Sequence, residues 1–417
     1  MLAGVCAALH VGKLAPAIGA LQQALALTLV QAGFALGIVQ AAGMCLGLAF
    51  GAGADGLGAR RSMLIGLLVL GTASALGGSA TGAAMLMALR GIEGLGFLLV
   101  ALPAPGLVRR LVPAARVDRV LGVWGAYMPV ATALALLLGP LVIGALTWRG
   151  WWWTLATVTF AMAVWLAHAV PADVERGSAT GGVRGGTHDS AGEAATAAAS
   201  SRAPPACGDA WSARLRQTLV APGPWLVALC FAMYSGQWLA VIGFLPTLYT
   251  QAGVSPTAVG ALTALAAAVN AIGNLSAGRL MHRGVPPPRL LATGFAVMAL
   301  AAAAAFGGND GNSDGGLPPA WRYAAVLLFS GVGGLVPATL FALAVRLAPG
   351  ERTVSTTVGW MQQWSSFGQF AGPPAVAWLA SVAGGWQFTW LATGACSAAG
   401  LLLTALLARR LRLHRGR

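Results

Sequence analysis

Two pairs of ionisable side chains interrupt long apolar stretches of this 417-residue chain. His10 and Lys13 are three positions apart, and Arg90 and Glu93 have the same spacing. On a helix this spacing places both members of a pair on one face. A charge at the centre of a bilayer costs about 2.5–3.5 kcal/mol even on the gentler insertion scales, so each group needs a partner or a water-filled cavity. These residues are therefore candidates for binding a polar solute or moving a proton.

Each candidate has a functional and a structural interpretation. Glu93 can load and release a proton, or it can form a static ion pair with Arg90 that holds helices together. Lys13 can capture an anionic or carbonyl group of a solute, or it can pair with Glu93 or extend toward the membrane surface. His10 can be a hydrogen-bonding neighbour of these groups or a packing residue. The sequence leaves these alternatives open.

Glutamine and asparagine side chains near the middle of other apolar stretches are further candidates. They are Gln40, Gln237, Asn270, Asn274, Gln362, Gln363 and Gln369. Polar side chains within a membrane favour a bundle interior or a water-filled cavity over the lipid. We expect a central cavity lined by Lys13, Arg90, Gln237, Asn270 and Gln362, with His10 and Gln40 as further solute-binding residues.

The composition is that of an integral membrane protein. Hydrophobic residues make up 57% of the chain and charged residues 9%, against about 25% charged in an average soluble domain. The net charge of +14 does not indicate nucleic-acid binding, because the basic residues are spread over short loops between apolar stretches. The five cysteines have no metal-like spacing, and the one lysine, Lys13, belongs to no phosphate-binding loop. We expect no cofactor, metal or nucleic-acid partner.

Stretches of about 20 apolar residues predict transmembrane helices. Twelve such spans lie near residues 1–21, 27–53, 62–80, 83–107, 120–146, 151–170, 223–250, 256–281, 287–306, 321–348, 354–381 and 385–408. Spans 3, 6, 9 and 12 have no interior charge or amide, so we expect every third helix to be peripheral. The prolines of spans 1, 4, 7 and 10, where a lost backbone hydrogen bond permits bending, are Pro16, Pro103, Pro246 and Pro337.

The spans divide into two sets of six. We expect an N-terminal bundle over 1–170, a cytoplasmic linker over 171–222, a C-terminal bundle over 223–408 and a basic cytoplasmic tail over 409–417. Near the end of the linker, Trp211, Leu215 and Leu219 have helical spacing, which favours a short helix on the membrane surface, with a flexible tether as the alternative. Arginines concentrate in the loops after even-numbered spans and in the tail, so both termini should be cytoplasmic.

A short charged turn lies between the second and third spans. It runs from Gly51 through Asp55 and Gly58 to Arg60 and Arg61. It resembles the loop between helices 2 and 3 of the major facilitator superfamily, which forms part of a cytoplasmic gate. The sequence departs from the family pattern at Gly53, Gly56 and Ala59. The resemblance implies a gate at these residues, and the alternative is a basic loop that only sets topology.

Two further motifs carry the resemblance. The stretch from Arg90 to Gly96 resembles the span-4 motif of the family, with Glu93 in place of a glutamine. The family associates this arginine with coupling to protons. The residues around Gly139 and Pro140 partly resemble the span-5 motif of proton-linked exporters. The general layout is also similar to small-anion carriers of the cyanate type.

The resemblance implies an all-α integral membrane protein with twelve transmembrane helices in two pseudo-symmetric six-helix bundles. It implies a secondary active transporter of the inner membrane that moves a small organic solute by alternating access, coupled to protons through Glu93 and Arg90. The alternatives are a permease subunit energised by a separate ATPase and a small-anion carrier without proton coupling. We expect no enzymatic activity, and a monomer whose partners are the solute, protons and the lipid bilayer.

Overall fold

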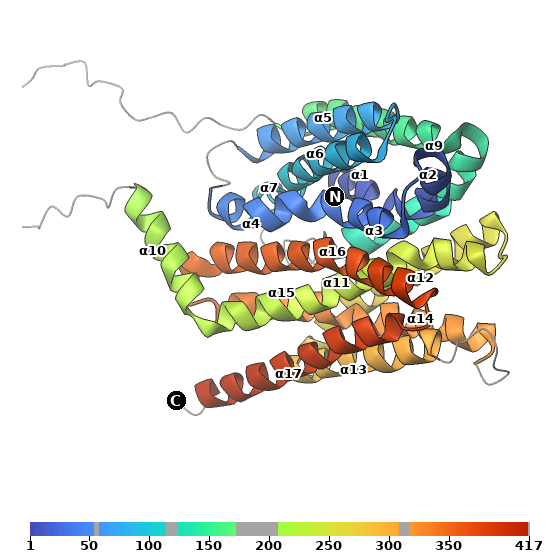
Figure 1. Cartoon of the computed structure of the whole chain (residues 1–417). Coiled ribbons are helices and arrows are strands. Elements are labelled where there is room, and N and C mark those ends of the chain that lie inside the picture. The colour runs from blue at the N-terminus through green and yellow to red at the C-terminus, as the bar shows by residue number, and fades with distance from the viewer. Residues whose placement is uncertain (54–57, 114–123, 172–206, 308–316, 416–417) are drawn as a thin grey trace, which may run out of the picture.

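The computed structural model describes residues 1–53, 58–113, 124–171, 207–307 and 317–415, and its regular elements there are all helical. Ten helical stretches among these residues are long and apolar enough to cross a membrane. Figure 1 shows the helices from α1 to α9, coloured blue to green, on one side of those from α11 to α17, coloured yellow to red.

The first group contains the spans that carry the charged candidates. Its elements are α1 (Leu2–Gly12), η1 (Ala15–Ala17), α2 (Ile18–Leu25), α3 (Leu29–Gly37), η2 (Ile38–Gln40), α4 (Ala41–Gly53), α5 (Ala59–Gly77), α6 (Ala83–Ala101), α7 (Ala104–Leu111) and α9 (Tyr127–Ala169).

The second group follows α10. Its elements are α10 (Cys207–Val220), α11 (Pro222–Gln251), α12 (Pro256–His282), α13 (Pro287–Phe306), α14 (Pro319–Gly333), α15 (Leu335–Leu347), η3 (Glu351–Thr353), α16 (Val354–Ala383) and α17 (Thr389–Arg415). The helix favoured at the end of the linker is therefore present as α10, and the tether alternative is wrong for residues 207–220.

Two of the predicted spans are found in one continuous element. α9 has 43 residues, which as a straight helix would be about 65 Å long and twice the thickness of the hydrocarbon core. Thr147 has φ 64° and ψ 174°, which breaks the helix and separates residues 127–146 from 148–169. α16 has 30 residues but is not among the ten stretches that are apolar enough to cross a membrane. It contains the three glutamines of span 11, which lower its hydropathy. With both taken into account, the predicted all-α, multi-span architecture is confirmed.

Several spans are interrupted where prolines or glycines occur. The first span breaks between α1 and η1 beside Pro16, and the fourth breaks at Pro103, between α6 and α7. The tenth breaks at Gly334, three residues before Pro337. Pro246, in contrast, lies inside an unbroken α11. Three of the four proline-containing spans are thus interrupted, and Lys13 lies directly after the last residue of α1.

The two groups meet along a seam formed by α3 and α4 against α16. At Gly37 an added Cβ would lie 2.5 Å from the carbonyl oxygen of Phe370, so only glycine permits this approach. Further along, Gln40 donates to Gln369 at 3.1 Å, and the Leu48 amide donates to Gln363 at 3.0 Å. α9 and α12 provide a second contact between the groups. The division into two bundles at the predicted boundaries stays a prediction.

Candidate functional site

A fully buried ionic cluster joins α1 to α6. The Lys13 Nζ atom donates to Glu93 Oε1 at 2.5 Å, and Arg90 Nη1 donates to Glu93 Oε2 at 2.7 Å. All three residues have 0% exposure. The two carboxylate oxygens are therefore divided between two cations from different helices. We call Lys13, Arg90 and Glu93 the ionic cluster.

Hydrogen bonds to neighbouring helices hold Lys13 and His10 in place. Lys13 Nζ also donates to Ser74 Oγ at 2.9 Å and to His10 Nδ1 at 3.3 Å. Because Nδ1 accepts this bond, the proton of the neutral imidazole is on Nε2, which lies 2.8 Å from Thr159 Oγ1. The Thr159 hydroxyl itself donates a hydrogen bond to the carbonyl of Leu155 at 2.7 Å. His10 is therefore the tautomer protonated on Nε2, and both of its ring nitrogens have hydrogen-bond partners.

Arg90 connects the cluster to the backbone of two other segments. Its Nη1 atom donates to the carbonyl of His10 at 2.5 Å, and its Nε atom donates to that of Ala35 at 3.3 Å. Its Nη2 atom is buried and has no hydrogen-bond partner among the described residues. One guanidinium nitrogen therefore remains available for an acceptor that the described residues do not supply.

The local sequence explains how these helices come so close. A Cβ at Gly94 would overlap the backbone of Val39, so α6 can approach η2 only with glycine at this position. After α1 ends at Gly12, the carbonyl of Lys13 accepts a hydrogen bond from Trp151 Nε1 at 3.0 Å. Trp152 lies with its ring 4.6 Å from Lys13 Nζ, close enough for a cation–π contact. The tryptophans at the start of the sixth span thus contribute to the site.

Sequence reasoning missed the hydroxyl residues of this site. Ser74 lies on α5 and Thr159 on the second part of α9, which are the predicted third and sixth spans. Those spans were expected to be peripheral because they contain no interior charge or amide. A search for Ser and Thr within the same apolar stretches would have found both residues, although it would also have found threonines that bond only to their own helix, such as Thr157.

The hydrogen bonds of the predicted amides do not reach the ionic cluster. Gln40 bonds across the seam to Gln369 and accepts from Ser366 at 3.2 Å. Asn270 donates to Tyr234 Oη at 2.9 Å and to the carbonyl of Ser330 at 2.8 Å. The Asn270 contacts join α12 to α11 and α14, all in the second group. Gln362 is half-buried on α16.

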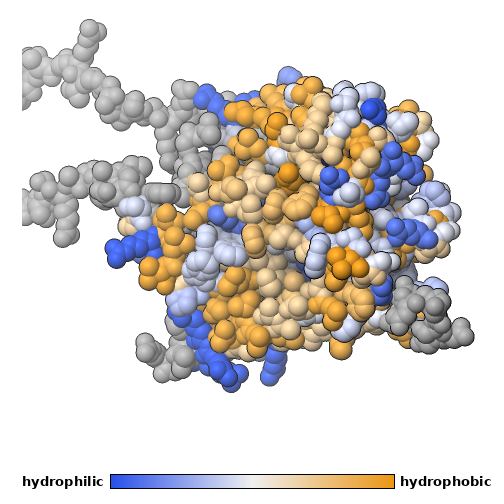
Figure 2. Space-filling model, viewed as in Figure 1, coloured by the Kyte–Doolittle hydropathy of each residue, from blue (hydrophilic) through white to orange (hydrophobic). Residues whose placement is uncertain are grey.

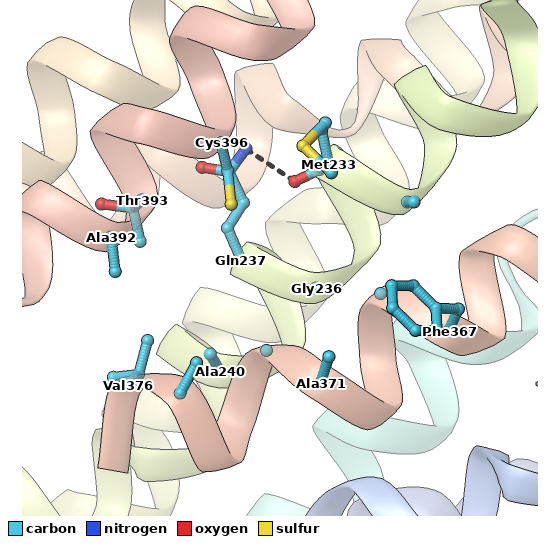
Figure 3. A pocket seen from close by; sticks show the side chains of 14 residues that line it. Met233, Gly236, Gln237, Ala240, Phe367, Ala371, Val376, Ala392, Thr393 and Cys396 are labelled. Atoms are coloured by element: carbon cyan, nitrogen blue, oxygen red, sulfur yellow. Dashed lines mark hydrogen bonds between the residues drawn. The ribbon is translucent and has the colours of Figure 1, made fainter. Parts of the chain in front are cut away.

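Gln237 lies on the wall of a cavity between α11, α16 and α17, which Figure 3 shows from close by. The cavity has a volume of about 180 Å³ and shares no lining residue with the ionic cluster. The side chain of Gln237 is already bonded, because it donates to the carbonyl of Met233 and accepts from Ser397 Oγ. The structure therefore separates the candidates into an ionic site on α1 and α6, the seam, the contacts of Asn270 within the second group, and a largely apolar cavity.

The candidate gate is described only in part. Gly58 has φ 76°, a left-handed conformation that favours glycine. Arg60 Nη2 donates to the carbonyl of Ala167 at 2.6 Å, which ties the start of α5 to the end of α9. Gly51 belongs to the helical backbone of α4, and Arg61 is exposed. Asp55 lies outside the described residues.

Comparisons with known proteins give one family. The model of the Major Facilitator Superfamily matches residues 1–362 and 227–416. An uncharacterized MFS-type transporter of Mycobacterium tuberculosis (strain ATCC 25618 / H37Rv) is 35% identical over 124 residues. That match covers 28% of this chain and 21% of the length of the relative.

Solved structures share the fold at low sequence identity. A crystal structure of a bacterial homologue of the human lysosomal transporter Spinster, inward-facing and occupied, has a TM-score of 0.74 at 13% identity and covers 98% of this chain and 95% of its own. A D-xylose–proton symporter has a TM-score of 0.70 at 15% identity, with 97% and 94% covered. These two likenesses concern the fold alone.

Proposed function

The chain belongs to the major facilitator superfamily of membrane transporters, and on that premise we propose that it moves a small organic solute by alternating access, coupled to protons through Glu93. The observation that carries the proposal is the carboxylate of Glu93 between Lys13 Nζ at 2.5 Å and Arg90 Nη1 at 2.7 Å, fully buried. A carboxylate in this position has a protonation state that decides how α1 and α6 are held together.

Protonation and cation binding compete for the same carboxylate oxygens. When Glu93 is ionised, its charge attracts the Lys13 ammonium, and this ion pair joins α1 to α6. A proton on Glu93 removes that attraction, so the Lys13 ammonium becomes free to bind an anionic or carbonyl group of the solute. Ser74 and His10 keep Lys13 oriented during the exchange. A ligand shifts a conformational equilibrium only through such a difference in interaction between the two states.

Other residues complete the proposal. Gln40 and Gln362 become solute contacts when the two groups of helices move apart, in addition to His10, Lys13 and Arg90. Gln237 and Asn270 contact the solute when it replaces their present partners within the second group. The turn containing Gly51, Asp55, Gly58, Arg60 and Arg61 acts as the gate. We propose that the protein is a monomer in the cytoplasmic membrane. Both termini are placed in the cytoplasm because arginines concentrate on that side of the predicted topology.

A second candidate is a small-anion carrier without proton coupling. The ionic cluster holds two basic side chains and one carboxylate, and Arg90 Nη2 has no partner among the described residues. A monovalent anion would balance the extra charge and accept a hydrogen bond from this nitrogen. In this alternative Glu93 stays ionised and only positions the two cations.

The test is the pH change that a solute induces in proteoliposomes. Weak organic acids, cyanate-like anions and hydrophobic drugs are screened against the wild type and Glu93→Gln. Glu351→Gln, which changes an exposed carboxyl of η3, is the matched control. Proton coupling predicts that the control moves protons with the solute, whereas Glu93→Gln retains only solute exchange. Equal proton movement in both variants would refute coupling through Glu93, and anion transport without proton movement in the wild type would favour the second candidate.

A further inference from the structure

The cavity between α11, α16 and α17 exists because small residues face it. Gly368 and Gly372 of α16 pack directly on the backbone of Ala232 and Gly236 of α11, so no side chain fills the space beside them. α17 closes the third side with Ala392, Thr393 and Cys396. In Figure 3 the short side chains of Ala240 and Ala371 leave the centre between the three helices open.

The polar atoms on the cavity wall are already paired. Both polar atoms of Gln237 are bonded to Met233 and Ser397, and Thr393 Oγ1 donates to the carbonyl of Thr389 at 3.1 Å. A polar solute would find no unsatisfied partner among these groups. An apolar cavity of about 150 Å³ stays dry and accepts apolar ligands, and this cavity is somewhat larger, at about 180 Å³. The chemistry of the wall therefore selects an apolar occupant.

The cavity opens to the outside of the protein between exposed apolar residues. Phe367 at its rim is 44% exposed, and Ala375 is also exposed. Trp378, on the same face of α16, is 59% exposed. Figure 2 shows hydrophobic residues over a large part of this face of the molecule. In a chain of this family, such a surface contacts the acyl chains of the bilayer, which supply the occupant.

A smaller space continues the cavity toward one membrane surface. The two spaces share Ala240 and Val376, and the second reaches Leu248, Trp386 and Thr389 at the helix ends. From Ala232 to Leu248 the axis of α11 rises about 24 Å, which exceeds the depth of about 15 Å of one leaflet's hydrocarbon, half of the core thickness. The residues that line the two spaces therefore extend over more than the depth of one leaflet, although the second space itself is narrow, at about 10 Å³.

The end of this path offers a polar contact. Thr389 is 3% exposed, and its Oγ1 atom has no hydrogen-bond partner among the described residues. Trp386 lies beside it, with its Nε1 atom donating to Gln251 at 2.9 Å, as is typical of tryptophans at the membrane interface. An ester carbonyl at this level can accept the hydrogen bond of the Thr389 hydroxyl.

We propose that the groove between α16 and α17, floored by α11, binds one acyl chain of a membrane phospholipid. The glycerol ester lies at Thr389, and the chain extends past Val376 toward Phe367. This site is independent of proton coupling through Glu93. It lies behind α16, the helix that forms the seam with α3 and α4, so the bound chain supports that helix from its lipid side.

The experiment uses a phospholipid with a photoactivatable diazirine in its acyl chain, incorporated into proteoliposomes with the full chain. Label is mapped by mass spectrometry. We expect it to concentrate on peptides containing Ala240, Ala371 and Cys396. Ala371→Leu fills the cavity and should remove most of this label, whereas Ala395→Leu, on the exposed face of α17, should leave it unchanged. Even label over all exposed apolar faces, or label that persists in Ala371→Leu, would overturn the proposal.

A second measurement uses the unmodified chain, in case the filled variant folds poorly. The Cys396 thiol lines the cavity. Its alkylation by a thiol reagent with an apolar tail, read from the Cys396 peptide, should be fast in delipidated detergent and several-fold slower after phospholipid is added. The exposed Cys45 serves as the internal reference. Equal slowing at both cysteines, or protection of Cys396 by transported solute instead of phospholipid, would refute a lipid site.

Discussion

At the scale of single residues, the ionic cluster owes its properties to an unequal number of charges. Glu93 contacts both Lys13 and Arg90, so each cation depends on the same carboxylate. Removing one partner of a buried ion pair is costly because it leaves an uncompensated charge. The loss of Glu93 and the loss of Lys13 should therefore have different consequences.

Glu93→Gln should destabilise the protein more than Lys13→Met. The first substitution leaves two buried cations without a carboxylate, and a loss of about 3–5 kcal/mol is expected. The second leaves the Arg90–Glu93 pair intact at 2.7 Å and removes one cation. Thermal unfolding in detergent measures the order of the two Tm values, with Glu351→Gln as the surface reference. A lower Tm for Lys13→Met than for Glu93→Gln would contradict this description of the cluster.

Thr159→Val should destabilise the protein because it leaves the Nε2 proton of His10 without an acceptor. An unsatisfied buried donor costs about 1–3 kcal/mol. Thr157→Val is the matched control, since Thr157 is exposed on the same helix and bonds only to the carbonyl of Trp153. The difference in unfolding free energy between the two variants is the readout. Equal stability of the two would show that the His10–Thr159 contact at 2.8 Å contributes nothing measurable.

At the scale of helices, glycines and breaks determine where the polar side chains meet. The sequence predicts the spans because their apolar runs are long, and it predicts points of bending in four spans because proline lacks a backbone donor. Three of those four spans are interrupted. It does not predict which helices touch. The contact of Gly94 with Val39 and the contribution of Ser74 to Lys13 depend on the packing of elements far apart in the chain. Single-sequence patterns contain no such pairing information.

Two glycines of α6 provide a direct test of this packing. Gly94→Ala places a methyl group against the backbone of Val39, and overpacking of this kind costs about 1–3 kcal/mol. Gly91→Ala meets nothing within 4 Å and should be tolerated or mildly stabilising, because alanine is the better helix former. Tm in detergent and solute exchange in proteoliposomes are compared for both. If both substitutions behave alike, α6 does not depend on this close approach to η2.

At the scale of the whole molecule, the two groups of helices meet at the seam of α16 with α3 and α4 and at the contact of α9 with α12. The fold was accessible from the sequence, since twelve apolar spans and the turn motif resemble one family. The candidate site was accessible in part. Lys13, Arg90, Glu93 and His10 are brought together, whereas Gln237 and Asn270 bond within the second group of helices. Buried charges are rare enough to stand out in a sequence, but amides within a membrane also serve to hold helices together by hydrogen bonds.

The proposed topology predicts which turns are accessible from outside the cell. In a Cys45→Ala background, a membrane-impermeant maleimide should label Ser255→Cys in intact cells but label Glu351→Cys only after the membrane is opened. Both positions are exposed, and Ser255 follows the predicted span 7 whereas Glu351 follows the predicted span 10. The expectation rests on arginines that follow the even-numbered spans. Labelling of Glu351→Cys in intact cells would reverse the orientation.

The most direct test of proton coupling is the infrared difference spectrum of the purified protein in lipid between high and low pH. Protonation of Glu93 predicts a carbonyl stretch of a buried protonated carboxyl group at low pH, present in the wild type and in Glu351→Gln but absent from Glu93→Gln. The same spectrum should shift toward the protonated form when a transported solute is added. If the wild type and Glu93→Gln give identical spectra over the whole pH range in which transport occurs, Glu93 stays ionised and the coupling mechanism is wrong.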